Sequence, residues 1–217
     1  MDIEQARFNM VEQQIRPWNV LNQDVLDLLS KVKREEYVPE VYRTLAFVDM
    51  EIPLGHGEVM LAPKMEARIV QELNLKKTDR VLEIGSGSGY MTALLAHQAG
   101  HVFSVEIVPE LKADAERKLK AHDVDNVTLE VGDAAQGWAK HGPYDVIVLT
   151  GSVPVPPDAF LNSLKPGGRL FAMVGDAPVM EANLVTCVAD GVFNTVRLFE
   201  TCVAPLKNAL QPERFVF

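Results

Sequence analysis

The sequence predicts an α/β protein whose doubly wound, mostly parallel sheet ends in an antiparallel hairpin. A glycine-rich turn lies at residues 85–89, between an apolar strand pattern and a helical pattern. Around this turn and beyond it strand and helix patterns alternate, which indicates a parallel sheet with right-handed crossovers. Two long strand patterns, 179–188 and 193–203, then meet at Asp190-Gly191, a dipeptide typical of hairpin turns.

Each element is predicted from its hydrophobic period. Short apolar runs indicate buried strands, and longer segments with apolar residues three or four positions apart indicate helices. The expected strands are 79–84, 102–106, 127–131, 144–149 and 168–174, and the expected helices are 64–73, 89–99, 109–121 and 157–164.

The first 50 residues carry two helical stripes, which Pro17 separates because proline interrupts a helix. Asn22 is a suitable N-cap for a helix over residues 23–31. We therefore predict an N-terminal helical extension, residues 1–50, packed on a core domain, residues 51–217, within one compact unit.

The composition is ordinary for a soluble globular protein of 217 residues. Its net charge of −9 disfavours a nucleic-acid substrate, because phosphate backbones bind clustered Lys and Arg. Apolar runs are too short to span a membrane and the N-terminus has no signal-peptide core, so we expect a cytoplasmic protein without membrane contact. The five histidines lack metal-binding spacing, and we expect no metal site. Cys187 and Cys202 lie in apolar strand patterns and are expected to be buried free thiols.

The glycine turn predicts a nucleotide-type ligand at the start of a helix. Glycine is required where the backbone has a positive φ or approaches a ligand closely. A dinucleotide site has the pattern G-x-G-x-x-G, but here the third glycine, Gly89, comes one position early and Tyr90 takes its place. The pattern E-x-G-x-G-x-G resembles the first motif of class I S-adenosylmethionine (AdoMet) methyltransferases, whose Rossmann-like sheet also ends in an antiparallel hairpin. A dinucleotide oxidoreductase is the alternative.

Acidic residues follow the strands at positions that suit this cofactor. Glu106 ends the second strand and can accept hydrogen bonds from both ribose hydroxyls, although it could equally be a solvated strand end. The methyltransferase resemblance implies that Asp133 contacts the adenine amino group, and Asp133 could also be the N-cap of a short helix. Glu83 is expected near the amino group of the cofactor, or as a cap of the turn. The expected cofactor-binding residues are Val59, Met60, Glu83, Gly85, Ser86, Gly87, Gly89, Glu106, Ile107, Gly132, Asp133 and Ala134.

From about Val38 to Glu200 the chain resembles the protein-L-isoaspartate O-methyltransferase family. That family shows P-I-G-x-G-Q-T-I-S-x-P before its first motif, and residues 53–63 keep the prolines and glycines of this pattern. The prolines and glycines within residues 51–63 also predict that this segment is an irregular loop. The resemblance implies methyl transfer from AdoMet to the α-carboxylate of L-isoaspartyl residues in damaged proteins, which repairs them and releases S-adenosylhomocysteine. It also implies an altered order of the last two strands.

The chain departs from the family where Thr-Ile-Ser is replaced by Val59-Met60-Leu61. A lost hydrogen bond to a charged group costs about 1.5–3 kcal/mol, which indicates weaker repair activity or another acceptor. The alternatives are therefore an AdoMet methyltransferase with a different acceptor and a non-catalytic AdoMet-binding relative. No catalytic residue is assigned, because an acceptor carboxylate is already ionised at neutral pH. The candidates for contact with the acceptor are His56, Leu61, Thr150 and Ser152.

Overall fold

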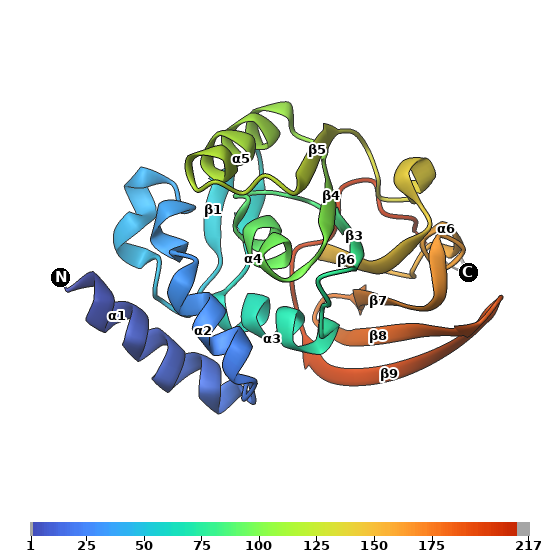
Figure 1. Ribbon diagram of the computed structural model, residues 1–217, viewed down its shortest axis with the longest axis horizontal. Helices are drawn as coiled ribbons and strands as arrows, with labels where there is room; N and C mark the ends of the chain where they lie inside the picture. The colour runs from blue at the N-terminus through green and yellow to red at the C-terminus, as the bar shows by residue number, and fades with distance from the viewer. Residues whose placement is uncertain (1, 212–217) are drawn as a thin grey trace, which may run out of the picture.

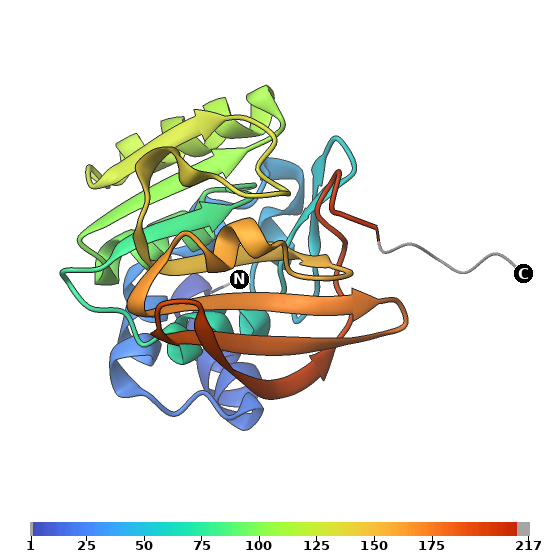
Figure 2. The same ribbon diagram turned by 90° about the vertical axis from the view of Figure 1, so that its right-hand side faces the viewer.

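The computed structural model describes residues 2–211. Seven strands form one sheet in the order β5-β4-β3-β6-β7-β8-β9, which Figure 2 shows from the yellow-green β5 at the top to the red β9 at the bottom. The first five strands pair in parallel, whereas β8 pairs antiparallel with both β7 and β9. The predicted fold class is therefore confirmed. The strands are β3 (Arg80–Ile84), β4 (His101–Glu106), β5 (Val127–Val131), β6 (Tyr144–Val153), β7 (Leu164–Asp176), β8 (Val179–Ala189) and β9 (Val192–Thr201).

Four helices accompany the sheet, and prolines open two of them. Pro63 and Pro109 occupy the first turns of α3 and α5, where the missing N–H of proline leaves no hydrogen bond unmade. The helix expected at 157–164 is shorter in the structure, because Leu164 already pairs with Tyr144 in the sheet. The helices are α3 (Pro63–Leu73), α4 (Tyr90–Gln98), α5 (Pro109–Ala121) and α6 (Asp158–Leu161).

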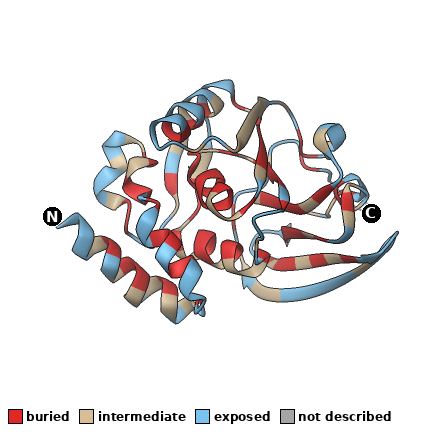
Figure 3. Ribbon diagram, viewed as in Figure 1, coloured by how far each residue is buried: buried red, intermediate tan, exposed pale blue. Residues whose placement is uncertain are grey.

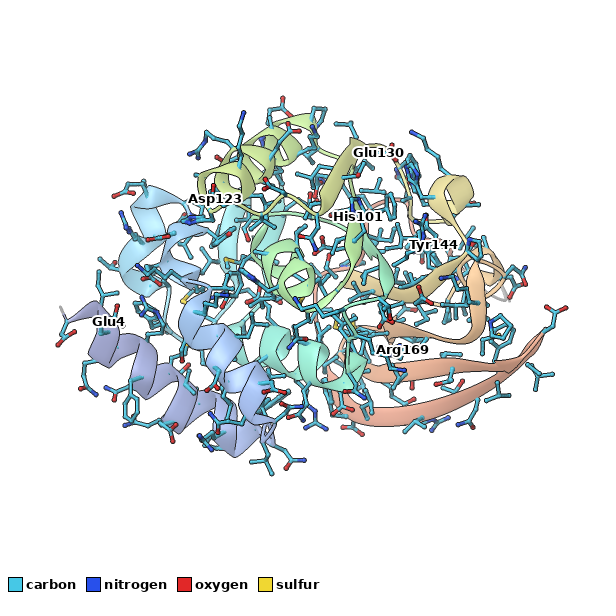
Figure 4. All side chains as sticks on the ribbon, in the orientation of Figure 1. Glu4, His101, Asp123, Glu130, Tyr144 and Arg169 are labelled. Atoms are coloured by element: carbon cyan, nitrogen blue, oxygen red, sulfur yellow. The ribbon has the colours of Figure 1, made fainter. Side chains whose placement is uncertain are left out.

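The two faces of the sheet belong to two hydrophobic clusters. Successive side chains of a strand point to opposite faces, so Val81 joins the cluster that contains α3 and α4, whereas Leu82 joins the cluster that contains Phe160 of α6. Figure 3 shows α4 buried almost throughout, while the edge strand β9 is largely exposed. Arg169 connects β7 to the end of α3 and to the next loop, where its Nη2 donates to Asp79 Oδ2 at 3.0 Å (Figure 4).

Residues 2–50 pack beside α3 and α4 (Figure 1). The first helix, α1 (Ile3–Met10), continues as a π turn and then as a 3₁₀ turn that contains Pro17. The second, α2 (Gln23–Lys31), begins at the predicted N-cap, because the side chain of Asn22 accepts hydrogen bonds from two backbone N–H groups. Two short 3₁₀ helices follow, Arg34–Glu36 and Glu40–Leu45. Residues of this segment belong to the same hydrophobic cluster as α3 and α4.

The structure corrects two predictions. The prediction of an irregular loop over 51–63 is wrong: β1 (Ile52–Gly55) and β2 (Glu58–Met60) form an antiparallel hairpin. A two-stranded ribbon tolerates Pro53, because a proline at an edge has no ladder hydrogen bond to lose. Of the two free cysteines, Cys187 is buried as expected but Cys202 is exposed, since it follows the edge strand β9.

The last two strands follow chain order in the sheet: β8 lies beside β7, and β9 lies beside β8 at the edge. No helix within residues 2–211 is both long and apolar enough to cross a membrane. Residues 212–217 of the predicted core domain and Met1 of the predicted extension lie outside the described residues.

Candidate active site

A cavity opens at the carboxyl ends of the parallel strands, where β3 lies between β4 and β6. This is the switch point at which open α/β sheets bind ligands. The cavity holds about 880 Å³ of space when the open solvent at its mouth is included. The predicted cofactor-binding residues line it, with the exception of Glu83 and Gly89.

The glycine turn forms the floor of the cavity. Gly85 has a φ of 95°, and a Cβ added there would lie 2.4 Å from Oγ1 of Thr150. The Thr150 hydroxyl lies within hydrogen-bonding distance of the carbonyl oxygens of Ile84 (2.8 Å) and Gly85 (2.9 Å). The buried Oγ of Ser86 has no hydrogen-bond partner among the described residues and lies in the lining of the cavity. The turn therefore provides both space and a free polar group for a ligand.

Gly89 has a different function from the other two glycines. It is the N-cap of α4 with a φ of 83°, and a Cβ there would approach Ala115 of α5 at 3.1 Å. The third glycine of the motif thus permits two helices to pack closely and does not line the cavity.

Glu106 is held in place at the end of β4. Glu106 is only 3% exposed, so the alternative that it is a solvated carboxylate at a strand end is wrong. One carboxylate oxygen accepts a hydrogen bond from the backbone N–H of Gly87 (2.9 Å) and the other from that of Val108 (3.0 Å). Carboxylate oxygens can accept more than one hydrogen bond, so Glu106 retains capacity for hydroxyl donors in the cavity.

Asp133 lines the cavity beyond the end of β5. Its Oδ1 accepts from the N–H of Ala135 at 3.1 Å, and its Oδ2 accepts from Nδ2 of Asn208 at 2.8 Å. No helix begins here, so the alternative role as a helix N-cap is wrong and the side chain instead closes a turn. The preceding residue has to be glycine, because a Cβ on Gly132 would lie 2.5 Å from the ring of Trp138.

Glu83 lies buried behind the glycine turn and outside the cavity lining. Its Oε2 accepts hydrogen bonds from the hydroxyls of Thr92 and Ser104, both at 2.6 Å. Burial raises the pKa of Glu83 to about 7, although these hydroxyls oppose the rise. The structure therefore places this carboxyl group in a support that joins β3, β4 and α4.

The β1–β2 hairpin and Leu61 form one wall of the cavity. Arg34, which is fully buried, donates from Nη2 to the Leu61 carbonyl (2.7 Å) and from Nε to the Ala46 carbonyl (2.9 Å). Its Nη1 forms an ion pair with Glu66, which also lines the cavity. Sequence analysis did not identify Arg34 or Glu66, since a charged residue in a helical pattern carries no sign of such a contact.

The four acceptor-side candidates do not come together. Leu61 and Thr150 line the cavity, whereas His56 is exposed at the hairpin turn and is absent from the lining. Ser152 is 1% exposed, and its hydroxyl donates to the carbonyl of Val203. Residues 204–207 also line the cavity, and the sequence did not reveal them because they follow the last strand.

Two of the histidines, His101 and His141, contact other side chains. His101 Nε2 lies 2.9 Å from the hydroxyl of Thr128 on the neighbouring strand, and the ring of His141 stacks on Phe103. Within residues 2–211 no group of three or more His, Cys, Asp and Glu side chains is placed to hold a metal ion.

Comparisons with known proteins agree with this architecture. A sequence model of the family described as "Protein-L-isoaspartate(D-aspartate) O-methyltransferase (PCMT)" matches residues 5–210. The protein-L-isoaspartate O-methyltransferase of Serratia proteamaculans is 42% identical over 163 residues, which cover 75% of this chain and 78% of that protein. The enzyme of that name from Yersinia enterocolitica is 40% identical over 182 residues, or 84% of this chain and 86% of that protein.

Solved structures show the same fold. One from Plasmodium falciparum, described as a candidate β-aspartate methyltransferase (PCMT) in complex with S-adenosyl-L-homocysteine, has a TM-score of 0.77 and 22% identity. The similarity covers 95% of this chain and 99% of that chain. The family match over residues 5–210 and the two relatives at 42% and 40% identity show that the chain belongs to the protein-L-isoaspartate O-methyltransferase family.

Proposed function

We propose that this protein uses AdoMet to methylate the α-carboxylate of L-isoaspartyl residues in damaged proteins. The observation that carries the proposal is the family match over nearly the whole chain, in a structure whose strand ends form the expected cavity. Homologues about 40% identical carry the name of this activity. The alternative acceptors suggested by Leu61 have no comparable support.

The cavity fits AdoMet. The buried Ser86 hydroxyl without a partner and the glycine floor, which a single Cβ at Gly85 would obstruct, both suit a polar ligand in close contact with the backbone. Glu106 would hold the ribose hydroxyls and Asp133 the adenine end, with the backbone of the glycine turn against the amino-acid end. Val59 and Met60 would cover the ligand from the hairpin side.

Reaction at this site requires alignment of the reactants more than proton transfer. When bound, AdoMet supplies a methyl group on a positively charged sulfur, and the acceptor carboxylate becomes a methyl ester. The α-carboxylate has an unperturbed pKa of about 3.5, so no residue has to remove a proton from it at neutral pH. Alignment can lower a barrier by roughly 7–11 kcal/mol. The walls formed by the hairpin and by residues 204–207 would align the acceptor and exclude water.

A pair of peptides tests the proposed function. The protein with AdoMet should methylate an isoaspartyl peptide and leave its normal aspartyl counterpart unmodified, measured as base-labile methyl ester. A peptide whose isoaspartyl α-carboxylate is converted to the amide is the matched control. No ester at an enzyme concentration equal to that of the peptide would reject repair activity, and calorimetry with S-adenosylhomocysteine would then show whether the cofactor site remains.

A further inference from the structure

Neither of the acceptor-side candidates that line the cavity, Leu61 and Thr150, offers a free hydroxyl group. Leu61 has no hydroxyl group, and the hydroxyl of Thr150 is engaged with the carbonyl oxygens of the glycine turn. The side chains that carry carboxyl groups into the lining are Glu58, Glu66, Glu106 and Asp133. Like charges repel, so a carboxylate that enters this cavity needs a cation. Among the described residues that line it, Lys207 is the only cationic one.

Lys207 reaches the cavity from the segment after β9 and faces the β1–β2 hairpin. Its Nζ lies 2.6 Å from Oε1 of Glu58 and donates to the carbonyl of His56 at 2.9 Å. An ammonium group has three N–H donors, so these two contacts leave a third donor available. The side chain is 41% exposed, which leaves it accessible from the mouth of the cavity.

The backbone around Lys207 is anchored on both sides. Ser152 of β6 donates its backbone N–H to the Ala204 carbonyl (3.0 Å) and accepts from the N–H of Leu206 (2.9 Å). On the other side, Asn208 donates to Asp133, which lines the cavity. These contacts hold the segment against the strand ends, so the ammonium group has a defined position at the acceptor wall.

We infer that Lys207 binds the acceptor carboxylate and that Glu58 competes with the acceptor for it. The inference rests on the proposed function, since it concerns the acceptor of that reaction. The charge-assisted hydrogen bond from Lys207 replaces the contact that a hydroxyl at residue 61 would make. Lys207 is thus a substrate-binding residue that sets preference for an anionic acceptor.

Kinetics with the isoaspartyl peptide and binding to the S-adenosylhomocysteine complex together test the inference. Lys207→Met should raise the peptide KM about tenfold to a hundredfold, with kcat and the AdoMet KM within about threefold of the wild-type values. Lys207→Arg, which keeps the charge, should restore most of the lost affinity. Glu58→Gln should lower the peptide KM, because it removes the competing carboxylate.

Fluorescence anisotropy of a labelled peptide gives a readout that does not depend on turnover. The wild-type complex should bind the isoaspartyl peptide at least about tenfold more tightly than its α-carboxamide form, and Lys207→Met should abolish this difference. Lys140→Met is the matched control, since Lys140 also forms an ion pair with a glutamate but lies outside the cavity lining.

The outcomes separate the two hypotheses. If the wild-type protein methylates the peptide and Lys207→Met keeps its affinity, the inference is overturned and the proposed function stands. Equal weakening by Lys207→Met and Glu58→Gln would also overturn the inference, because it would indicate a purely structural ion pair. If the wild-type complex binds neither peptide, the proposed function fails and the inference fails with it.

Discussion

Gly85 and Gly167 have similar backbone angles but different surroundings, so together they separate backbone strain from steric conflict. Their φ values are 95° and 80°, yet a Cβ at Gly167 would meet nothing within 4 Å, whereas one at Gly85 would meet Thr150. A side chain in this left-handed region costs about 1–2 kcal/mol. Gly167→Ala should lose that amount in urea unfolding, and Gly85→Ala should lose more and bind S-adenosylhomocysteine more weakly. Equal losses with unchanged binding would contradict this account of the turn.

The carboxylate of Glu106 is expected to contribute to cofactor affinity. Glu106→Gln keeps the size of the side chain but loses the negative charge, so S-adenosylhomocysteine should bind about tenfold to a hundredfold more weakly in calorimetry, equivalent to roughly 1.5–3 kcal/mol. Glu116→Gln is the control, because Glu116 lies exposed on α5. An unchanged dissociation constant for Glu106→Gln would remove Glu106 from the site.

Glu83 should make stability depend on pH. Burial raises its folded-state pKa from 4.5 to about 7, so the folded protein holds this proton more tightly than the unfolded chain does. Its contribution to stability is therefore complete below pH 4.5 and is lost as the pH rises through about 7. Glu83→Gln, which cannot ionise, should gain stability relative to the wild-type protein over this interval. Urea unfolding between about pH 5 and about pH 8 measures the difference, and a constant difference would contradict the prediction.

At the scale of elements, the β1–β2 hairpin depends on a buried arginine from the N-terminal segment. Arg34 joins the Leu61 carbonyl, the Ala46 carbonyl and Glu66, so residues 12 to 32 positions away in the sequence meet at one guanidinium group. The hairpin is therefore a braced wall of the cavity. This arrangement explains how a segment rich in prolines and glycines can have a defined position.

Loss of one partner in this brace should be costly. Arg34→Met should destabilise the protein by about 3–5 kcal/mol in urea unfolding, because the buried carboxyl group of Glu66 loses its partner. The double variant Arg34→Met/Glu66→Leu should recover part of that loss, since no buried charge remains. Arg43→Met is the control, as its pair with Glu40 is exposed and should contribute at most about 1 kcal/mol. A double variant less stable than Arg34→Met would contradict the prediction.

At the scale of the whole molecule, the cavity wall combines three parts of the chain. The glycine turn and strand ends provide the floor, and the hairpin and residues 204–207 complete the lining. Residues of the N-terminal segment, α3, α4 and the sheet share one hydrophobic cluster. Because the site forms only when these parts fold together, ligand binding should stabilise the folded protein as a whole.

The preference of the site for S-adenosylhomocysteine or NAD can be measured as the stabilisation of the folded protein that each ligand produces. S-adenosylhomocysteine at about 100 times its dissociation constant should raise the free energy of unfolding by about 2.7 kcal/mol. NAD at the same concentration should have no effect, because the helix start lacks the third glycine of a dinucleotide site at Tyr90. Stabilisation by NAD alone would instead support the dinucleotide alternative.

The sequence predicted the sheet, its terminal hairpin and most of the cofactor side of the cavity. These features follow from local patterns: the period of apolar residues, the glycines of the 85–89 turn, where φ is positive, and an acid at a strand end. The same approach was wrong about residues 51–63, because prolines and glycines are also compatible with a short two-stranded ribbon. It also placed Cys202 inside, although an apolar pattern does not show which strand lies at an edge.

By itself the sequence determined the fold class, the family and the position of the cofactor turn, since each depends on residues that are close together in the chain. Only the tertiary structure decided that Glu83 supports the turn from behind, that Arg34 holds the hairpin, and that Lys207 pairs with Glu58 of the hairpin. The contacts of Arg34 and Lys207 join residues from distant parts of the chain. The position of Glu83 depends on the direction in which its buried side chain points. Such contacts arise from the packing of the sheet and its surrounding segments, which no local pattern encodes.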